Sequence, residues 1–188
     1  KFEVSAESQA DLRSGLDLPR KRKIAIFAGR FVEKKGLSLI HSLTEYFPGV
    51  LFLFCGTGPL DPSRWDRPNV RVLGQKAASQ LQELLFASDI LLLPLVIQEA
   101  MACGLPCFIL DETWASWGRD RSFFVVTHRE TVETDFRSYL DDPFPFALRQ
   151  KIQEFSLTTW NWQRPAAQYH RIYDTLLKTR AVEKTVCA

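Results

Sequence analysis

The sequence predicts an α/β protein built on a doubly wound parallel sheet, followed by a helical C-terminal tail. Short, continuous apolar runs recur along the chain and end in glycine or at a turn, as the buried strands of a parallel sheet do. Segments with apolar residues at helical spacing alternate with these runs. Hydrophobic residues make up 46% of the 188 residues and charged residues 24%, which is ordinary for a globular domain and excludes a disordered chain.

The first half of the chain predicts three strands and two helices. The run 24–28 is apolar and is closed by Gly29, which indicates a buried strand. Apolar residues at helical spacing over 37–47 predict a helix that Pro48 and Gly49 terminate. The remaining expected elements are a strand over 50–55, a strand over 70–73 and a helix over 80–87.

The second half continues the alternation and then becomes helical. Strands are expected over 89–93, 107–110 and 123–126, with a short helix over 96–103 that Gly104 and Pro106 terminate. Alternating strands and helices imply a parallel sheet covered on both faces. Helices are then expected over 131–140, 146–155 and 166–177. The last of these carries an apolar stripe, which predicts either core or a face for another domain; its members are Tyr169, Ile172, Tyr173 and Leu176.

One main domain is expected. Residues 1–23 are polar, end in the basic run 20–23 and are interpreted as a lead-in or linker. The domain itself spans 24–178, and 179–188 form a C-terminal tail. Because the chain starts at Lys1 without an initiator methionine or a signal-peptide pattern, we expect a piece of a longer protein.

Charge and composition exclude several classes of function. A net charge of +2 is too small to indicate a nucleic-acid partner or an anionic membrane, and no apolar run is long enough to span a bilayer. The four cysteines show no C-x-x-C spacing, which argues against a disulfide scaffold or a thiolate zinc site and fits a reducing, cytoplasmic compartment. Three scattered histidines suggest no metal site.

Candidate binding residues follow the expected strands, because ligands of open α/β sheets bind at the carboxyl ends of the strands. After the first strand, Gly29 allows a turn, and Arg30 and Lys35 place two cations beside the start of a helix, where an anion such as a diphosphate is favoured. From this stretch alone, two solvated basic residues on a loop are the alternative. Glu99 begins a later helix, where a carboxylate suits the helix dipole but can also accept hydrogen bonds from a ribose diol.

Taken in order, these segments resemble the C-terminal, donor-binding domain of family-4 retaining glycosyltransferases (glycosyl transferases group 1), the C-terminal half of the GT-B fold. The blocks that carry the resemblance are G-R-x-x-x-K-K-G, F-C-G-T-G-P, N-V-R-V-L-G, A-S-D-I-L-L-L-P and Q-E-A-M-A-C-G-L-P. The match is strong over 24–106 and looser to Leu177. It implies a Rossmann-like sheet, and an N-terminal acceptor domain that is absent from this chain.

The resemblance implies a role for each matched residue. Arg30 and Lys35 match the basic pair that neutralises the donor diphosphate and stabilises it as leaving group, and both are expected to be catalytic. Glu99 matches the second Glu of the family's E-x7-E motif, which holds the nucleotide ribose, and Ile97, two residues earlier, is also expected to bind the donor nucleotide. The other residues expected to bind the nucleotide are glycines that follow the ends of strands and a segment that lines the base pocket: Gly29, Gly56, Gly58, Val72, Leu73 and Gly74.

The implied activity is transfer of a hexosyl-type sugar from a UDP-, GDP- or ADP-linked donor to an acceptor hydroxyl with retention, in carbohydrate biosynthesis. No metal or other cofactor is expected, because the basic pair takes the metal's place. The chain alone is expected to bind nucleotide without turnover. No nucleic-acid partner is expected from the small net charge, and a peripheral membrane association of the full-length protein stays open.

Two departures from the family pattern keep alternatives open. The family carries a segment like S-x-x-E-G-F-G where Pro94 here leads directly into Leu95 and Val96, so the first Glu of E-x7-E is missing. Either this segment is deleted or it is missing from the sequence as given. Second, residues 111–118 replace a Gly-rich turn; their two tryptophans could form a platform for a sugar, mark another gap, or belong to the core.

Two other function classes stay under consideration. A non-catalytic binding or scaffold domain of the same fold would explain the missing carboxylate segment. A dinucleotide-dependent oxidoreductase would fit the α/β alternation, but the first strand is not followed by G-x-G-x-x-G and no acidic residue closes the second strand.

Overall fold

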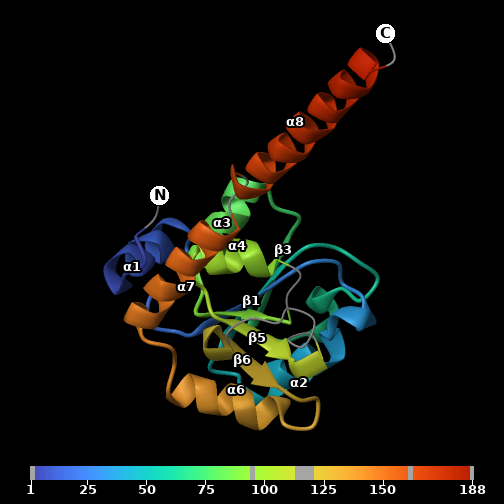
Figure 1. Cartoon of the computed structure of the whole chain (residues 1–188). Helices are drawn as coiled ribbons and strands as arrows, with labels where there is room; N and C mark the ends of the chain where they lie inside the picture. Colours follow the sequence, from blue (N-terminus) through green and yellow to red (C-terminus); the bar gives the residue numbers. More distant parts are fainter. Residues whose placement is uncertain (1–2, 94–95, 113–120, 161–162, 187–188) are drawn as a thin grey trace.

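A computed structural model describes residues 3–93, 96–112, 121–160 and 163–186 of the chain. Its centre is a six-stranded parallel sheet in the order β3-β2-β1-β4-β5-β6 (Figure 1). The strands are β1 (Ile24–Ala28), β2 (Leu51–Cys55), β3 (Val70–Gly74), β4 (Ile90–Leu92), β5 (Cys107–Leu110) and β6 (Phe124–Thr127). The predicted fold class and all six predicted strands are confirmed.

Helices cover both faces of this sheet. The helices of the described residues are α1 (Ala6–Gly15), α2 (Leu37–Tyr46), α3 (Ala78–Ala87), α4 (Ile97–Ala102), α6 (Val132–Asp141), α7 (Phe146–Thr159) and α8 (Gln163–Val186), with short 3-10 helices η1 (Glu33–Lys35), η2 (Pro62–Trp65) and η3 (Arg121–Phe123). Figure 1 shows α3, α4 and α7 on one side of the sheet and α2 and α6 on the other. Two separate apolar clusters fill these two layers.

Strand β1 illustrates how the sequence produces a doubly covered sheet. Every residue of the strand is buried. Ile24, Ile26 and Ala28 belong to one apolar cluster, whereas Ala25 and Phe27 belong to the other, because successive side chains of a strand point to opposite faces. The strand pairs with β2 on one side and β4 on the other. The strand order therefore reverses at β1, and such a reversal is where open α/β sheets form a crevice at their carboxyl edge.

Residues 1–23 differ from the expected polar lead-in, because they contain helix α1. The N-cap of this helix, Ser5, accepts a hydrogen bond from the Ser8 backbone N–H. The helix packs against α3. Its buried positions are polar, Gln9 and Arg13, so the apolar periodicity that announces a helix is absent. Hydrogen bonds of these two side chains, described below, attach the helix to the domain.

The C-terminal helix α8 is longer than the predicted 166–177 segment and reaches Val186. Figure 1 shows it projecting away from the sheet. The apolar stripe of Tyr169, Ile172, Tyr173 and Leu176 is more than half exposed at every position. The prediction that this stripe belongs to the core of the domain is therefore wrong, and the prediction of a face for another domain is untested.

Candidate functional site

The carboxyl ends of β1, β2 and β3 are joined to one another by backbone hydrogen bonds. The Gly29 N–H donates to the Cys55 carbonyl at 2.9 Å, and the Gly56 N–H donates to the Gly74 carbonyl at 2.9 Å. A Cβ at Gly56, where φ is 146°, would lie 1.9 Å from the Gly29 carbonyl oxygen. Only glycine fits this close approach, so the three strand exits stay together without any side chain between them.

A pocket of about 430 Å³ opens at this edge of the sheet. It joins the exits of β1 and β2, the two residues after β3, one residue of α3 and the residue that precedes α4. Its lining residues are Ala28, Gly29, Arg30, Cys55, Gly56, Thr57, Gln75, Lys76, Leu81 and Val96. The structure thus brings three predicted site residues together here: Gly29, Arg30 and Gly56.

Two cations line the pocket, and both are accessible to a ligand. Arg30 and Lys76 are both exposed. Among the described residues, neither has a carboxylate within 4.0 Å of its charged group. An unpaired guanidinium and an unpaired ammonium beside one pocket favour a ligand with several negative oxygens, such as a phosphate or diphosphate.

Lys35 lies on the same loop as Arg30 but does not line the pocket. It is half-buried at the end of η1, and its backbone N–H donates to the Val32 carbonyl at 3.0 Å. The next residue, Gly36, has a left-handed backbone (φ 74°) and lies against the Leu93 side chain at the exit of β4. Lys35 therefore lies immediately before a glycine that packs against Leu93 after β4, two residues before the start of α2.

Glu99 and Ile97 occupy the first turn of α4, outside the pocket lining. The Glu99 side chain is exposed and lies close enough to Cys103 to raise the pKa of that thiol slightly, although burial is the main cause of the increase to about 12. Ile97 is 1% exposed and belongs to the core, so its side chain is not accessible to a ligand. Val96, the residue before it, does line the pocket.

The remaining predicted residues do not line the pocket. Val72 and Leu73 are half-buried in β3, and Gly74 has a left-handed backbone (φ 69°) with no atom within 4 Å of where a Cβ would be. Gly58 has a structural reason for being glycine, since a Cβ there would lie 2.5 Å from the Phe31 carbonyl oxygen. Whether these residues bind a nucleotide is a prediction that the structure leaves untested.

Sequence reasoning missed Lys76, Gln75 and Cys55. The available signal for Lys76 was its position two residues after a glycine-ended strand, at the edge where ligands bind. Burial raises the pKa of the Cys55 thiol to about 11, and the nearby Lys76 ammonium opposes that shift. Cys55 is therefore a protonated thiol at neutral pH, and it is unsuited to act as a nucleophile.

Some predictions concern residues or properties outside this pocket. Residues 94–95, where the missing carboxylate segment is expected, and the tryptophans Trp114 and Trp117 lie outside the described residues. In the described part of the chain no three His, Cys, Asp or Glu side chains gather as they would around a metal ion; the prediction of metal-free chemistry stays a prediction. None of the described helices is long and apolar enough to cross a membrane.

The doubly wound sheet and the basic pocket at its carboxyl edge define a Rossmann-like α/β domain. A family model, Glycosyl transferases group 1, matches residues 8–115. The chain therefore belongs to the group 1 glycosyltransferase family. The match begins inside α1, which places this helix within the family domain.

A curated sequence relative agrees with this assignment. The chain is 27% identical over 119 residues to TuaC of Bacillus subtilis (strain 168), provisionally described as a glycosyltransferase of teichuronic acid biosynthesis. That match covers 59% of this chain and 30% of TuaC. The chain thus spans about a third of the length of this curated relative.

Similar solved structures show the same fold. Sucrose-phosphate synthase from Thermosynechococcus elongatus superimposes with a TM-score of 0.77 at 21% identity, over 90% of this chain and 49% of that one. Anabaena HepE, solved in complex with UDP, gives a TM-score of 0.71 at 16% identity, over 93% and 56%. Starch synthase IV from Arabidopsis thaliana, bound to ADP and acarbose, gives 0.66 at 14% identity, over 93% and 44%.

Proposed function

We propose that this chain is the donor-binding half of a retaining glycosyltransferase that uses a nucleoside-diphosphate sugar. The observation that carries the proposal is the pocket of about 430 Å³ at the carboxyl edge of the sheet, with exposed, unpaired Arg30 and Lys76 in its lining. Family membership supports glycosyl transfer. The ligands in structures of the same fold, which include UDP, UDP-glucose and ADP, support a nucleotide donor.

In the proposed reaction the bond between the sugar's anomeric carbon and the diphosphate oxygen breaks. A new bond forms to an acceptor hydroxyl oxygen, the nucleoside diphosphate leaves with the electron pair of the broken bond and so with added negative charge, and the hydroxyl proton passes to that diphosphate or to solvent. Arg30 and Lys35 stabilise that charge, and Lys76 reaches the same ligand from the β3 side. Such electrostatic stabilisation of a leaving group needs no bound metal when fixed cations supply the positive charge.

The nucleoside is proposed to lie along the exits of β2 and β3. The backbone of Val72, Leu73 and Gly74 would bound the base, and the exposed Glu99 carboxylate at the start of α4 would accept hydrogen bonds from the ribose hydroxyls. The acceptor site is assigned to an N-terminal domain. We therefore expect the chain by itself to bind nucleotide and to transfer no sugar. The proposal also includes a UDP-, GDP- or ADP-linked donor, transfer of a hexosyl sugar and a cytoplasmic location.

Calorimetric titration with UDP, GDP and ADP tests this proposal. Saturable binding of one diphosphate is expected. Arg30→Ala should weaken it by about tenfold or more, because a hydrogen bond between two charged groups is lost. The matched control is Arg64→Ala, an exposed arginine on η2 that does not line the pocket. Absence of binding by all three diphosphates at millimolar concentration would overturn the proposal.

Lys35→Ala tests the diphosphate role separately. We expect this variant to weaken binding of the preferred nucleoside diphosphate (UDP, GDP or ADP) far more than binding of the matching nucleoside, because a lysine beside a phosphate contributes nothing to base or ribose contacts. Equal losses for diphosphate and nucleoside would show that Lys35 only shapes the loop.

A non-catalytic binding domain of the same fold is the second candidate. The observation in its favour is that residues 93–96, which join β4 to α4, contain no carboxylate. An assay of sugar transfer by the full-length protein distinguishes the two candidates. Transfer of the donor's sugar to an acceptor rather than to water supports the enzyme. Tight nucleotide binding without any transfer supports the binding domain.

A further inference from the structure

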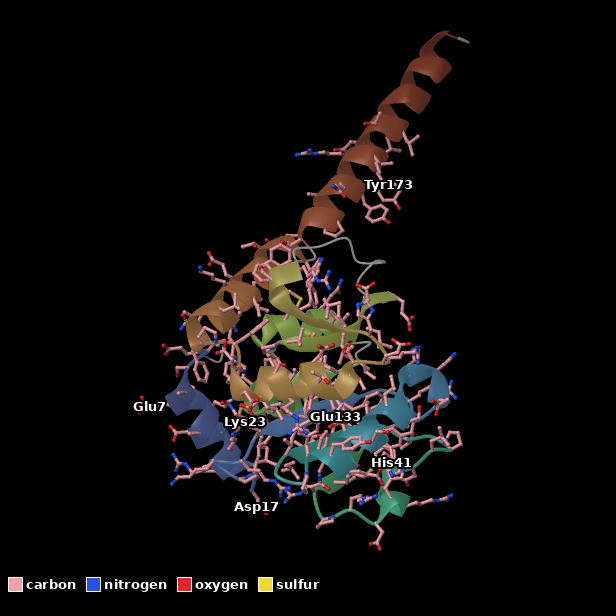
Figure 2. The ribbon with its side chains drawn as sticks, turned by 90° about the horizontal axis from the view of Figure 1, so that it is seen from below. Glu7, Asp17, Lys23, His41, Glu133 and Tyr173 are labelled. Carbon is pink, nitrogen blue, oxygen red and sulfur yellow. The ribbon has the colours of Figure 1, made fainter. Side chains whose placement is uncertain are left out.

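A second pocket, of about 370 Å³, lies at the opposite, amino-terminal edge of the sheet. Lys23 and Asp89, which immediately precede β1 and β4, line it together with residues of α1, α6 and α7. Figure 2 shows Lys23 in the space between α1 and α6. The pocket shares no lining residue with the one at the carboxyl edge.

The lining of this second pocket is strongly basic. Asp89 is the one carboxylate among its lining residues. The cationic lining residues are Arg13, Arg20, Lys21, Arg22, Lys23 and Arg149. Such an imbalance inside a concave surface attracts anions, since the positive potential of the individual groups adds up there.

Two of these cations are buried. Arg13 and Arg149 are each 4% exposed. Arg13 is fully engaged: its Nη2 is 2.8 Å from the Asp89 carboxylate, its Nε donates to the Ala87 carbonyl at 2.7 Å, and its Nη1 donates to two further carbonyls. The Asp89 oxygen that binds Arg13 also accepts the Ile24 backbone N–H at 2.7 Å. The Oδ2 of this carboxylate therefore serves Arg13 and the start of β1, and its Oδ1 lies 4.0 Å from the Lys23 ammonium.

Arg149 lacks such a counter-ion. Its Nε donates to the Gly104 carbonyl at 3.0 Å and its Nη2 to the Ser88 carbonyl at 3.3 Å. Among the described residues, no carboxylate lies within 4.0 Å of its guanidinium. Burial lowers the pKa of Arg149, and the ring of Phe146 stacks under the guanidinium, 5.0 Å from its carbon. A buried cation without a paired anion is costly, so a bound anion would stabilise this edge.

Two lysines of the pocket are available to such an anion. Lys21 is exposed and has no carboxylate within 4.0 Å among the described residues. Lys23 is partly exposed, and its Nζ only approaches Asp89, at 4.0 Å. Arg22, in contrast, already donates to the carbonyls of residues 48–50. Lys21 and Lys23 can therefore add two charges to the one that Arg149 supplies.

We propose that this amino-edge pocket is a binding site for a phosphate group, separate from the donor pocket. Three cations around one cavity match a doubly charged oxyanion better than a single carboxylate, and an arginine fork with lysine point charges suits phosphate oxygens. Phe144, Pro143 and Pro145 give the pocket an apolar wall, which leaves room for an organic group attached to the phosphate. The phosphate comes either from a soluble ester or from a lipid headgroup.

Titration of the protein with inorganic phosphate tests the site, in an Arg30→Ala background that disables the donor pocket. Saturable binding is expected, and the double variant K21Q/K23Q should weaken it by about fivefold, because two solvent-accessible ion pairs are lost. K151Q/R171Q, on exposed positions of α7 and α8, removes the same charge elsewhere and should leave binding unchanged. No saturable binding, or equal losses in both double variants, would overturn the proposal.

A second arm identifies the source of the phosphate. Co-sedimentation with phosphatidylcholine vesicles containing one quarter phosphatidylglycerol is compared with pure phosphatidylcholine vesicles. Binding to the anionic vesicles that K21Q/K23Q abolishes and K151Q/R171Q preserves assigns the site to a lipid headgroup. Phosphate binding without vesicle binding assigns it to a soluble phosphate ester. Vesicle binding that is identical in all variants, without phosphate binding, would contradict the site.

Discussion

The two edges of the sheet carry the same kinds of charged residue and use them in opposite ways. At the carboxyl edge, Arg30 and Lys76 are exposed, and neither has an ion pair among the described residues. At the amino edge, Arg13 and Arg149 are 4% exposed and donate to backbone carbonyls. The comparison shows that a buried arginine stabilises strand ends through carbonyl contacts, whereas an exposed one is available to a ligand; Arg149, which has no carboxylate within 4.0 Å among the described residues, is proposed to do both.

The backbone explains this difference. At the carboxyl edge the strand exits bond directly to one another through glycines, as between Gly56 and Gly74, so no side chain is needed to satisfy them. At the amino edge side chains satisfy the strand ends: Asp89 accepts the first N–H of β1, and Gln9, Arg13 and Arg149 cap carbonyls of residues 86–88 and 104. Charged side chains are therefore needed to stabilise the strand ends at the amino edge, whereas those at the carboxyl edge are free to bind a ligand.

Removing the carboxylate of the amino edge should have the largest effect. Asp89→Ala leaves the buried Arg13 unpaired and the Ile24 N–H without an acceptor, so we expect a loss of about 3–5 kcal/mol in the free energy of unfolding. Urea denaturation measures it. Asp11→Ala, which removes an exposed carboxylate 3.8 Å from Arg20, is the control and should cost less than about 0.5 kcal/mol. A loss for Asp89→Ala no larger than that of the control would break the comparison.

At the carboxyl edge the glycine contact should matter more than any charge. Gly56→Ala places a methyl group against the Gly29 carbonyl, at a φ of 146° that alanine avoids, and we expect a loss of roughly 2–4 kcal/mol. Gly74→Ala is the matched control, since its φ is also positive but the space around it is open. We expect it to cost about 1–2 kcal/mol. Equal losses in the two variants would mean that the positive φ alone, and not the close contact with the Gly29 carbonyl, makes Gly56→Ala destabilising.

A smaller effect is expected from the buried thiol at the carboxyl edge. The unfolded chain releases the Cys55 proton near pH 9.0 and the folded chain near pH 11. The folded state therefore holds more protons in this interval, and the free energy of unfolding should fall by about 1–2 kcal/mol as the pH rises from 9 to 11. Urea denaturation of the wild type and of Cys55→Ala at each pH isolates this contribution. Parallel curves for the two proteins would show that the thiol is not shielded.

The smallest effect on stability should come from Arg30. Because its side chain is exposed and has no ion pair among the described residues, Arg30→Ala should change the free energy of unfolding by less than about 0.5 kcal/mol. Thermal or urea unfolding measures it, beside the donor titration of the same variant. A loss as large as that expected for Gly74→Ala would place Arg30 among the residues that hold the fold, as at the amino edge.

Sequence patterning was sufficient for the sheet, because the strands are short, largely apolar runs that end at or just before a glycine, a proline or a polar residue; β3, which contains Arg71, is the one described strand interrupted by a charge. It was insufficient for α1, whose buried residues are Gln9 and Arg13; only their partners Ser88 and Asp89, which lie far along the chain, reveal why a polar helix is held in place. The apolar stripe around Tyr173 had the periodicity of a core helix, yet Figure 2 shows this residue on the projecting α8. Periodicity defines a face and does not specify what covers it.

The candidate site was likewise predicted only in part from the sequence. The glycines and Arg30 follow from their place after buried strands, and the pocket gathers Gly29, Gly56 and Arg30. Lys76 was missed although it lies two residues after the glycine that ends β3, because a single exposed lysine on a connecting segment equally fits a solvated surface residue. The amino-edge pocket escaped for a different reason: its cations come from α1, the 20–23 segment and α7, which only the tertiary structure brings together.

The central position of β1 has a consequence for synthesis on the ribosome. One side of this strand can pair with β2 soon after translation, but its other side must wait for β4, because the whole segment 29–89 lies between β1 and β4 in the chain. At roughly 5–20 residues per second, synthesis of that segment lasts about 3–12 s. During this interval the apolar strand presents an open hydrogen-bonding edge to the cell, which is when a nascent chain of this topology most needs a chaperone.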